Sequence, residues 1–257
     1  MRGTLDVAKR EIPDFIDVSR TTKSGMTITC DISRVIKILV SIVITLAFVG
    51  TIADIIKFQV APSTTHRLAR LMNRFVLGFE PSIPNWYSST ALFCSGILLA
   101  VIAIGKWQAK DRFSKHWTFM ALLFPVLSID EGVRLHEMIH TVMIKVVETS
   151  GIFYFPSVIP MSLFVAVFGL VYIPFLRHID RRTAILFVLA GGVYVFGTIG
   201  MDMVGGLILE NYGEASIQHT FTQLIEESCE MLGIVIFLYA LLDYIRRSIG
   251  SVHVRLA

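Results

Sequence analysis

Three stretches of the chain contain no charged side chain, and each is long enough to cross a lipid bilayer. They cover residues 81–105, 149–176 and 183–201, where Asp, Glu, Lys and Arg are all absent. A bilayer-spanning helix needs about 20 predominantly apolar residues. The whole chain is 54% hydrophobic and 17% charged, whereas a soluble domain is about 25% charged. The pattern excludes a soluble enzyme, a nucleic-acid module, a secreted disulfide scaffold and a disordered chain.

Six transmembrane helices fit this pattern best, because each apolar run approaches the length that crosses about 30 Å of hydrocarbon at ~1.5 Å per residue. The expected spans are about Ile38–Ile56, Trp86–Ile104, Trp117–Glu137, Pro156–Leu176, Thr183–Leu209 and Thr220–Tyr244. The predicted fold class is therefore all-α, a polytopic integral membrane bundle of six helices within residues 34–246. Residues 1–33 would form a cytoplasmic N-terminal segment, as a short helix or a partly disordered stretch, and residues 247–257 a cytoplasmic tail.

The basic residues predict the orientation of these spans. One side would carry 17 of them, seven up to residue 37, four in the second loop, three in the fourth loop and three after the last span. The opposite side would carry five. Cytoplasmic loops are enriched in Lys and Arg, so both termini are expected to face the cytoplasm.

Arginines and apolar side chains are interleaved in the stretch HRLARLMNRFVLGF, residues 66–79. Leu68, Leu71, Met72 and Phe75 recur at helical spacing, with arginines between them. The pattern predicts a short amphipathic helix over about residues 65–78, lying in the outer membrane interface with its arginines at the lipid headgroups. The alternative is an ordinary loop helix that packs on the bundle.

Carboxylates gather at one level of the predicted bundle. The ends of the first, third and fifth spans and the start of the sixth all fall in the outer half of the membrane. Ionised carboxylates that share a low-dielectric site repel one another, so some must be protonated, reach water or hold a cation. The acids and histidines that these ends bring together are Asp54, Asp130, Glu131, His136, Glu137, His140, Asp202, Glu226, Glu227 and Glu230.

Three interpretations of this cluster remain open, and none predicts a reaction type. In the first, a metal site binds iron, manganese or zinc through mixed oxygen and imidazole ligands. Its expected ligands are Glu131, His136, Asp202, Glu227 and Glu230, with Asp130, Arg134, Glu137, His140, Glu226 and Asp54 in supporting or proton-carrying positions. In the second, the carboxylates belong to a proton- or cation-coupled transporter. In the third, the cluster is structural, and the chain is a non-catalytic accessory subunit of a larger membrane complex or a homo-oligomer.

Four strings in the chain resemble the signatures of a widespread family of uncharacterised bacterial multi-pass membrane proteins. They are IPNWYSS (83–89), LSIDEGVRLHE (127–137), GMDMVGG (200–206) and LIEESCEMLGIVIFLYALL (224–242). The family carries similar N-I-P-T-W-Y/F-S-S, S-L-D-E…L-H-E and E-E…E-M-L-G motifs in this order, over a region like residues 75–245. The resemblance implies a bacterial inner-membrane fold with a site at these carboxylates. It implies no reaction, and His140 lies outside the signature.

Overall fold

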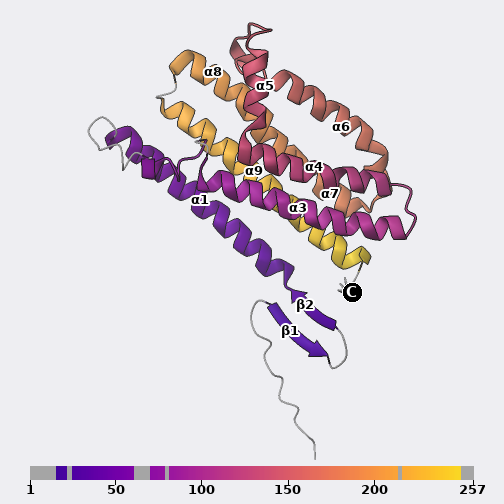
Figure 1. Ribbon diagram of the computed structural model, residues 1–257. Coiled ribbons are helices and arrows are strands. Elements are labelled where there is room, and N and C mark those ends of the chain that lie inside the picture. Colours follow the sequence, from indigo (N-terminus) through magenta and orange to yellow (C-terminus); the bar gives the residue numbers. More distant parts are fainter. Residues whose placement is uncertain (1–15, 22–24, 61–69, 79–80, 214–215, 250–257) are drawn as a thin grey trace, which may run out of the picture.

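A computed structural model describes residues 16–21, 25–60, 70–78, 81–213 and 216–249, which form a bundle of helices preceded by a β-hairpin (Figure 1). Strands β1 (Ile16–Thr21) and β2 (Gly25–Cys30) pair antiparallel. For these strands the expected short helix or partly disordered stretch is wrong. The sequences IDVSRT and GMTITC place apolar residues at alternate positions, and that period of two is typical of a strand.

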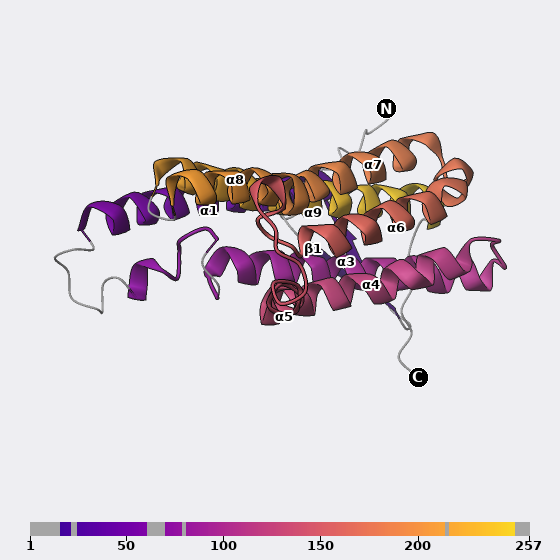
Figure 2. The ribbon, with the colours of Figure 1, turned by 90° about the horizontal axis from the view of Figure 1, so that it is seen from above.

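The helices after the hairpin form two layers, which Figure 2 shows from above. Helix α9 lies beside α1 and α7 in one layer, and α3 and α4 form the other, with α3 packed on α9. The helices are α1 (Ile32–Val60), α3 (Ile83–Gln108), α4 (Ser114–Val133), α5 (Leu135–Met143), α6 (Val158–His178), α7 (Arg181–Val195), α8 (Asp202–Tyr212) and α9 (Ile217–Tyr244). A 3-10 turn, η1 (Gly151–Phe153), and two π-helical turns, η2 (Phe196–Met201) and η3 (Ile245–Ile249), complete the described elements.

Polar side chains fix where three of the long helices begin. The hydroxyl of Ser82 accepts the backbone N–H of Asn85 at the start of α3, and Pro84 follows in its first turn. Asp180 accepts the N–H of Thr183 at the start of α7. The hydroxyl of Ser216 accepts the N–H of His219 at the start of α9. Such caps satisfy backbone donors that have no partner inside the helix. The sequence therefore encodes these helix starts locally.

Helices α3 and α4 run antiparallel and in register over most of their length. Trp107 donates its indole N–H to Thr118 at one end, 2.7 Å away. Ser89 and Ser128 exchange hydrogen bonds further along, at 2.7 and 2.8 Å to the two carbonyls. Asn85 contacts Glu131 at the other end. Helix α4 thus occupies the same depth of the bundle as α3.

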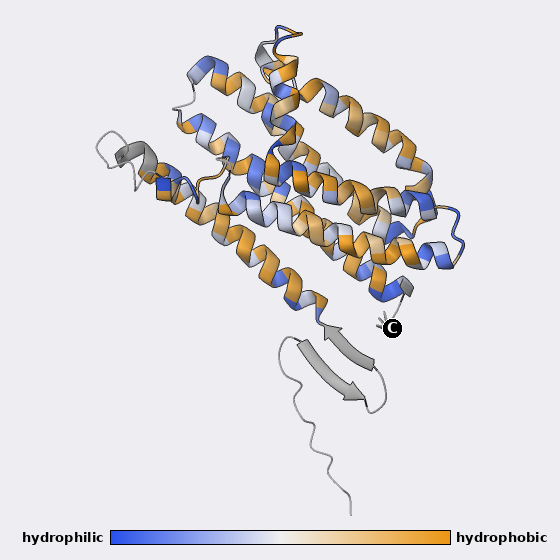
Figure 3. Ribbon diagram, in the orientation of Figure 1, coloured by the Kyte–Doolittle hydropathy of each residue, from blue (hydrophilic) through white to orange (hydrophobic). Residues whose placement is uncertain are grey.

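Within the described residues, five helical segments are long and apolar enough to cross a membrane, which is typical of a multi-pass membrane protein. They are Ile32–Ile56, Ile83–Gln108, Val158–His178, Arg181–Tyr212 and Ile217–Ser248. Figure 3 shows the apolar residues running along the helices. The expected third span, Trp117–Glu137, is not among them. Its helix, α4, ends at Val133, because Arg134 adopts a left-handed conformation (φ 63°) and α5 begins on a new course.

The described end of the expected interfacial helix, Arg70–Gly78, folds back into the bundle. Val76 and Leu77 are buried, and Leu77 packs in a cluster with Val43 of α1 and Met231 of α9. Residues 65–69 lie outside the described part of the chain. The segment from residue 70 therefore resembles the packed alternative more than a helix that rests on the lipid.

Candidate functional site

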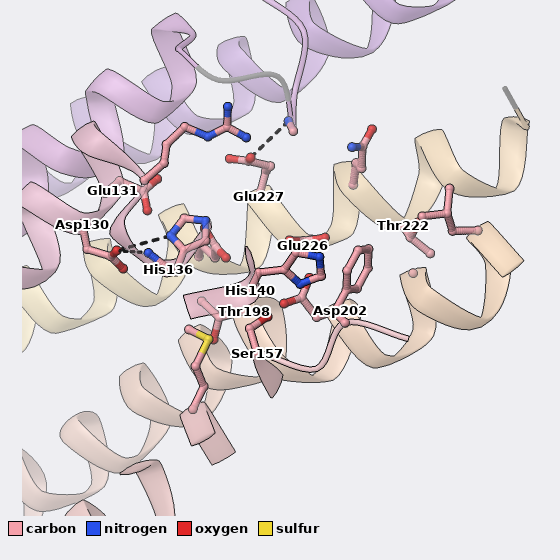
Figure 4. A pocket seen from close by; sticks show the side chains of 18 of the residues that line it. Asp130, Glu131, His136, His140, Ser157, Thr198, Asp202, Thr222, Glu226 and Glu227 are labelled. Atoms are coloured by element: carbon pink, nitrogen blue, oxygen red, sulfur yellow. Dashed lines mark hydrogen bonds and ion pairs between the residues drawn. The ribbon is translucent and has the colours of Figure 1, made fainter. Parts of the chain in front are cut away.

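A cavity of about 420 Å³ opens where α4, α5, α7, α8 and α9 meet. Figure 4 shows side chains from these elements converging on it from several directions. Its acidic lining residues are Asp130, Glu131, Asp202, Glu226, Glu227 and Glu230, and its basic or titratable ones are Arg134, His136, His140 and His219. Ser157, Thr198, Thr222, Gln223, Tyr194, Phe155, Met161 and Leu209 contribute neutral surface. The cavity combines six carboxylates with a single guanidinium among the residues that the structure describes.

The structure brings together the five residues that the sequence predicts as ligands, because all of them line this cavity. They are Glu131, His136, Asp202, Glu227 and Glu230. Asp130, Arg134, His140 and Glu226 line it as well. Asp54 does not, since it lies buried in α1 at 7% exposure, away from the cavity lining. Glu137 lies in α5, and its side chain is outside the described part.

Asp130 organises the break between α4 and α5. Its backbone carbonyl accepts the N–H of Arg134 at 2.6 Å, and its carboxylate accepts the N–H of His136 at 2.7 Å. The same carboxylate oxygen lies 3.4 Å from Nδ1 of His136. Asp130 therefore caps α5 and orients the imidazole that faces the cavity (Figure 4).

Two further contacts, which the sequence analysis missed, hold carboxylates in place. The side-chain amide of Asn85 in α3 donates to the backbone carbonyl of Glu131 at 2.5 Å and to its carboxylate at 3.2 Å. The backbone N–H of Gly78 donates to Oε1 of Glu227 at 3.1 Å. Asn85 belongs to IPNWYSS, one of the four strings that carry the resemblance, so the sequence contains a signal for this residue but not for its contact with Glu131. The sequence around Gly78 gives no such signal, because its N–H donates to a carboxylate that lies 149 residues later in the chain.

The π-helical turn η2 lies close to Glu226 and Glu230 of α9. A Cβ atom added at Gly197 would lie 2.9 Å from the carbonyl oxygen of Glu226 and 3.1 Å from Cγ of Glu230. Single π turns inside α-helices occur frequently at functional sites. The turn separates α7 from α8, and Asp202 follows it directly as the first residue of α8. The close approach at Gly197 thus places Asp202 and Glu230 in one lining.

The arrangement does not match a dehydrated metal centre. No group of three or more His, Cys, Asp and Glu side chains among the described residues is placed to hold a metal ion. Iron, manganese and zinc need ligand atoms at about 2.0–2.3 Å from one point. The carboxylates instead line a cavity of about 420 Å³.

Arg134 provides a test of the backbone conformation at the break between α4 and α5. Its left-handed conformation costs a non-glycine residue about 1–2 kcal/mol, so Arg134→Gly should be more stable than Arg134→Ala by about 1 kcal/mol. Both variants lack the guanidinium, which makes each the control for the other. Unfolding in detergent, followed by circular dichroism, measures the difference. Equal stabilities would mean that the left-handed backbone is not strained.

The helices and the acidic cavity together define a multi-pass type of membrane protein with a polar site inside an apolar bundle. The chain belongs to the family named Domain of unknown function (DUF8692), whose model matches residues 38–245. No curated protein and no solved structure matches the chain. The matched region contains every element that lines the cavity.

Proposed function

We propose that this protein binds a cation in the acidic cavity of a six-helix membrane bundle. The observation that carries the proposal is the convergence of six carboxylates, from α4, α8 and α9, on one space of about 420 Å³. Unit charges 4 Å apart interact by about 4 kcal/mol at an effective dielectric near 20. A cation that enters the cavity therefore relieves repulsion among groups that the fold already holds together.

The size of the cavity favours a cation that keeps part of its water shell, or a small organic cation. Ligand-binding cavities measure about 300–1,000 Å³, and this one lies at the lower end of that range. Direct binding of iron, manganese or zinc would require the carboxylates to close around one point. The aromatic rings of Phe155 and Tyr194 in the lining would also suit an organic cation, since ring faces attract positive charge.

We infer that α4 is the sixth membrane-crossing helix. Hydrogen bonds tie it to α3 from Trp107 at one end to Asn85 at the other, and α3 is one of the five apolar helices. A helix in register with a membrane span at that depth crosses the membrane with it. The distribution of basic residues supports an orientation with both termini in the cytoplasm and the cavity toward the outer side. The resemblance of the four sequence strings to bacterial proteins favours a bacterial inner membrane as the location.

A proton- or cation-coupled transporter is the second candidate, and the position of Glu230 favours it. Glu230 is the fourteenth of the 28 residues of α9, so its carboxyl group lies near the middle of the helix. Beyond it, Met231, Ile234 and Leu238 are buried apolar residues. Transport would require this apolar packing to open, whereas binding alone would not.

Cation binding is tested by the stability of the purified protein with Mn²⁺, Zn²⁺, Ca²⁺ or Na⁺, together with elemental analysis for bound iron, manganese and zinc. A cation at 100 times its Kd stabilises the folded state by about 2.7 kcal/mol. Glu230→Gln and Glu227→Gln should each weaken binding by about tenfold or more, because each removes a charge that faces the cation.

Glu148→Gln is the matched control, since Glu148 is exposed and lies outside the cavity lining. It should leave binding unchanged. Folded wild-type protein that no cation stabilises would contradict the proposal. Cation flux into liposomes that the cavity variants abolish would support the transporter. Absence of both cation binding and cation flux, together with stable co-purification of a partner, would support an accessory subunit.

A further inference from the structure

A second hollow lies on the outside of the bundle, and none of its lining residues lines the acidic cavity. It is a groove of about 290 Å³ between α4 and α6. Its apolar wall consists of Phe119, Phe164, Val167, Phe168, Val171 and Tyr172, and Lys115 and His116 line it at one end. Tyr172 closes that end by donating its hydroxyl to the carbonyl oxygen of His116, 2.9 Å away.

The groove faces the apolar surroundings of the bundle. It follows α6, which is one of the apolar helices of membrane length. Only 17% of the residues in the apolar stretch of α6 are buried inside the bundle. Phe119 is 48% exposed, and Val167 and Val171 are 52% and 54% exposed. In a membrane these side chains meet lipid tails, so the natural occupant of the groove is a hydrocarbon chain.

The shape of the groove suits one acyl chain. Ring centroids of Phe164 and Phe168 lie 6.1 Å apart, and those of Phe168 and Tyr172 lie 4.2 Å apart, so the three rings form a continuous wall. Phe119 completes it from α4, 6.4 Å from Phe168. From residue 164 to residue 172 the wall extends about 12 Å along the helix axis, at ~1.5 Å per residue.

The charge at the end of the groove selects the headgroup. Lys115 is exposed at the start of α4, at the end of the bundle where Asp111, Lys106 and His178 also gather. A cation beside an acyl-chain groove complements the phosphate of an anionic lipid. We propose that this groove is a binding site for an anionic phospholipid, with one acyl chain along the aromatic wall and the headgroup at Lys115.

The test measures how many lipids the detergent-purified protein retains, by native mass spectrometry, after exchange into dioleoyl phosphatidylglycerol or dioleoyl phosphatidylcholine. The wild type should prefer the anionic lipid. One Lys near a lipid surface contributes about 1 kcal/mol, so Lys115→Gln should reduce that preference by about fivefold. Val171→Trp should reduce the retention of both lipids, because the indole would fill the groove.

Two variants serve as matched controls. Lys110→Gln removes a nearby exposed charge that does not line the groove, and Leu170→Trp adds the same indole to α6 outside the lining. Both should retain lipid as the wild type does. Unchanged anionic preference in Lys115→Gln would overturn the proposal. A dimer that Val171→Trp dissociates, without a change in retained lipid, would also overturn it, because a second copy of the chain would then occupy the groove. The site is independent of the cation proposal, so either can fail alone.

Discussion

Replacing Gly233 with alanine is expected to destabilise the bundle by about 1–3 kcal/mol. Gly233 lies in α9 where α7 packs against it. A Cβ atom there would lie 2.8 Å from Cβ and 2.9 Å from the backbone nitrogen of Tyr194, and 3.0 Å from the carbonyl oxygen of Ala190. Two of these atoms belong to the backbone of α7, so relief requires the helices to move apart. Thermal unfolding in detergent measures the loss.

Gly191→Ala is the matched control for this prediction. It lies in α7, near the same helix pair, but an added Cβ meets nothing within 4 Å among the described residues. Alanine has a higher helix propensity than glycine by about 1 kcal/mol, so this variant should be as stable as the wild type or more so. If both variants unfold alike, helix propensity and not close packing decides the stability at these glycines.

Replacing Asp243 with asparagine is expected to cost about 3 kcal/mol of stability. Asp243 is completely buried near the end of α9. Its carboxylate lies 2.7 Å from Arg246, 2.9 Å from Arg247 and 3.2 Å from Arg182 of α7. The asparagine side chain keeps the shape but removes the charge that three guanidinium groups face. The connection between α7 and the end of α9 should therefore weaken, and unfolding in detergent would report it.

A neighbouring carboxylate shares this network at the surface. Arg247 also contacts Asp180 at 3.0 Å. Burial acts to raise the pKa of Asp180, but hydrogen bonds from Thr183 and the ion pair with Arg247 hold that pKa below its ordinary value. Asp180 therefore adds stability that is present at neutral pH and is lost as the pH falls through its lowered pKa.

Arg246→Gln is the control for the Asp243 prediction, because the Arg246 side chain is 63% exposed and its loss leaves Arg182 and Arg247 beside the buried carboxylate. It should therefore cost less stability than Asp243→Asn. A loss in Arg246→Gln as large as that in Asp243→Asn would mean that the contact with Arg246 alone, and not the buried charge facing three guanidinium groups, determines the stability.

The helical character of the chain could be predicted from hydropathy, whereas the ends and breaks of its helices could not. The apolar runs around residues 83–108 and 158–178 became helices of membrane length because burial of apolar side chains in lipid depends on local composition. The run after Trp117 contains Pro125 and Gly132, but helix α4 continues through both of them to Val133, so neither marks its last residue. Its helix ends there because Arg134 takes a left-handed backbone, stabilised by the bond from its own N–H to Asp130.

The candidate site shows the same division. The sequence placed Glu226, Glu227 and Glu230 together near the start of the sixth predicted span, and the structure places all three in the cavity lining. Sequence alone could not reveal that Asn85 fixes Glu131, or that Gly78 fixes Glu227. These contacts join residues that are far apart in the chain, and a local sequence pattern does not predict which distant residues meet.

The sequence by itself determined that the chain forms apolar helices of membrane length and that its carboxylates are concentrated in a few helix segments. Both properties follow from the order of residues along single helices. The tertiary structure decided which carboxylates share a cavity, and that α4 stops before His136, Glu137 and His140. It also decided that α4 and α6 leave an aromatic groove with Lys115 at its end. These features depend on how the helices pack against one another, since a contact between helices requires side-chain shapes from both to fit.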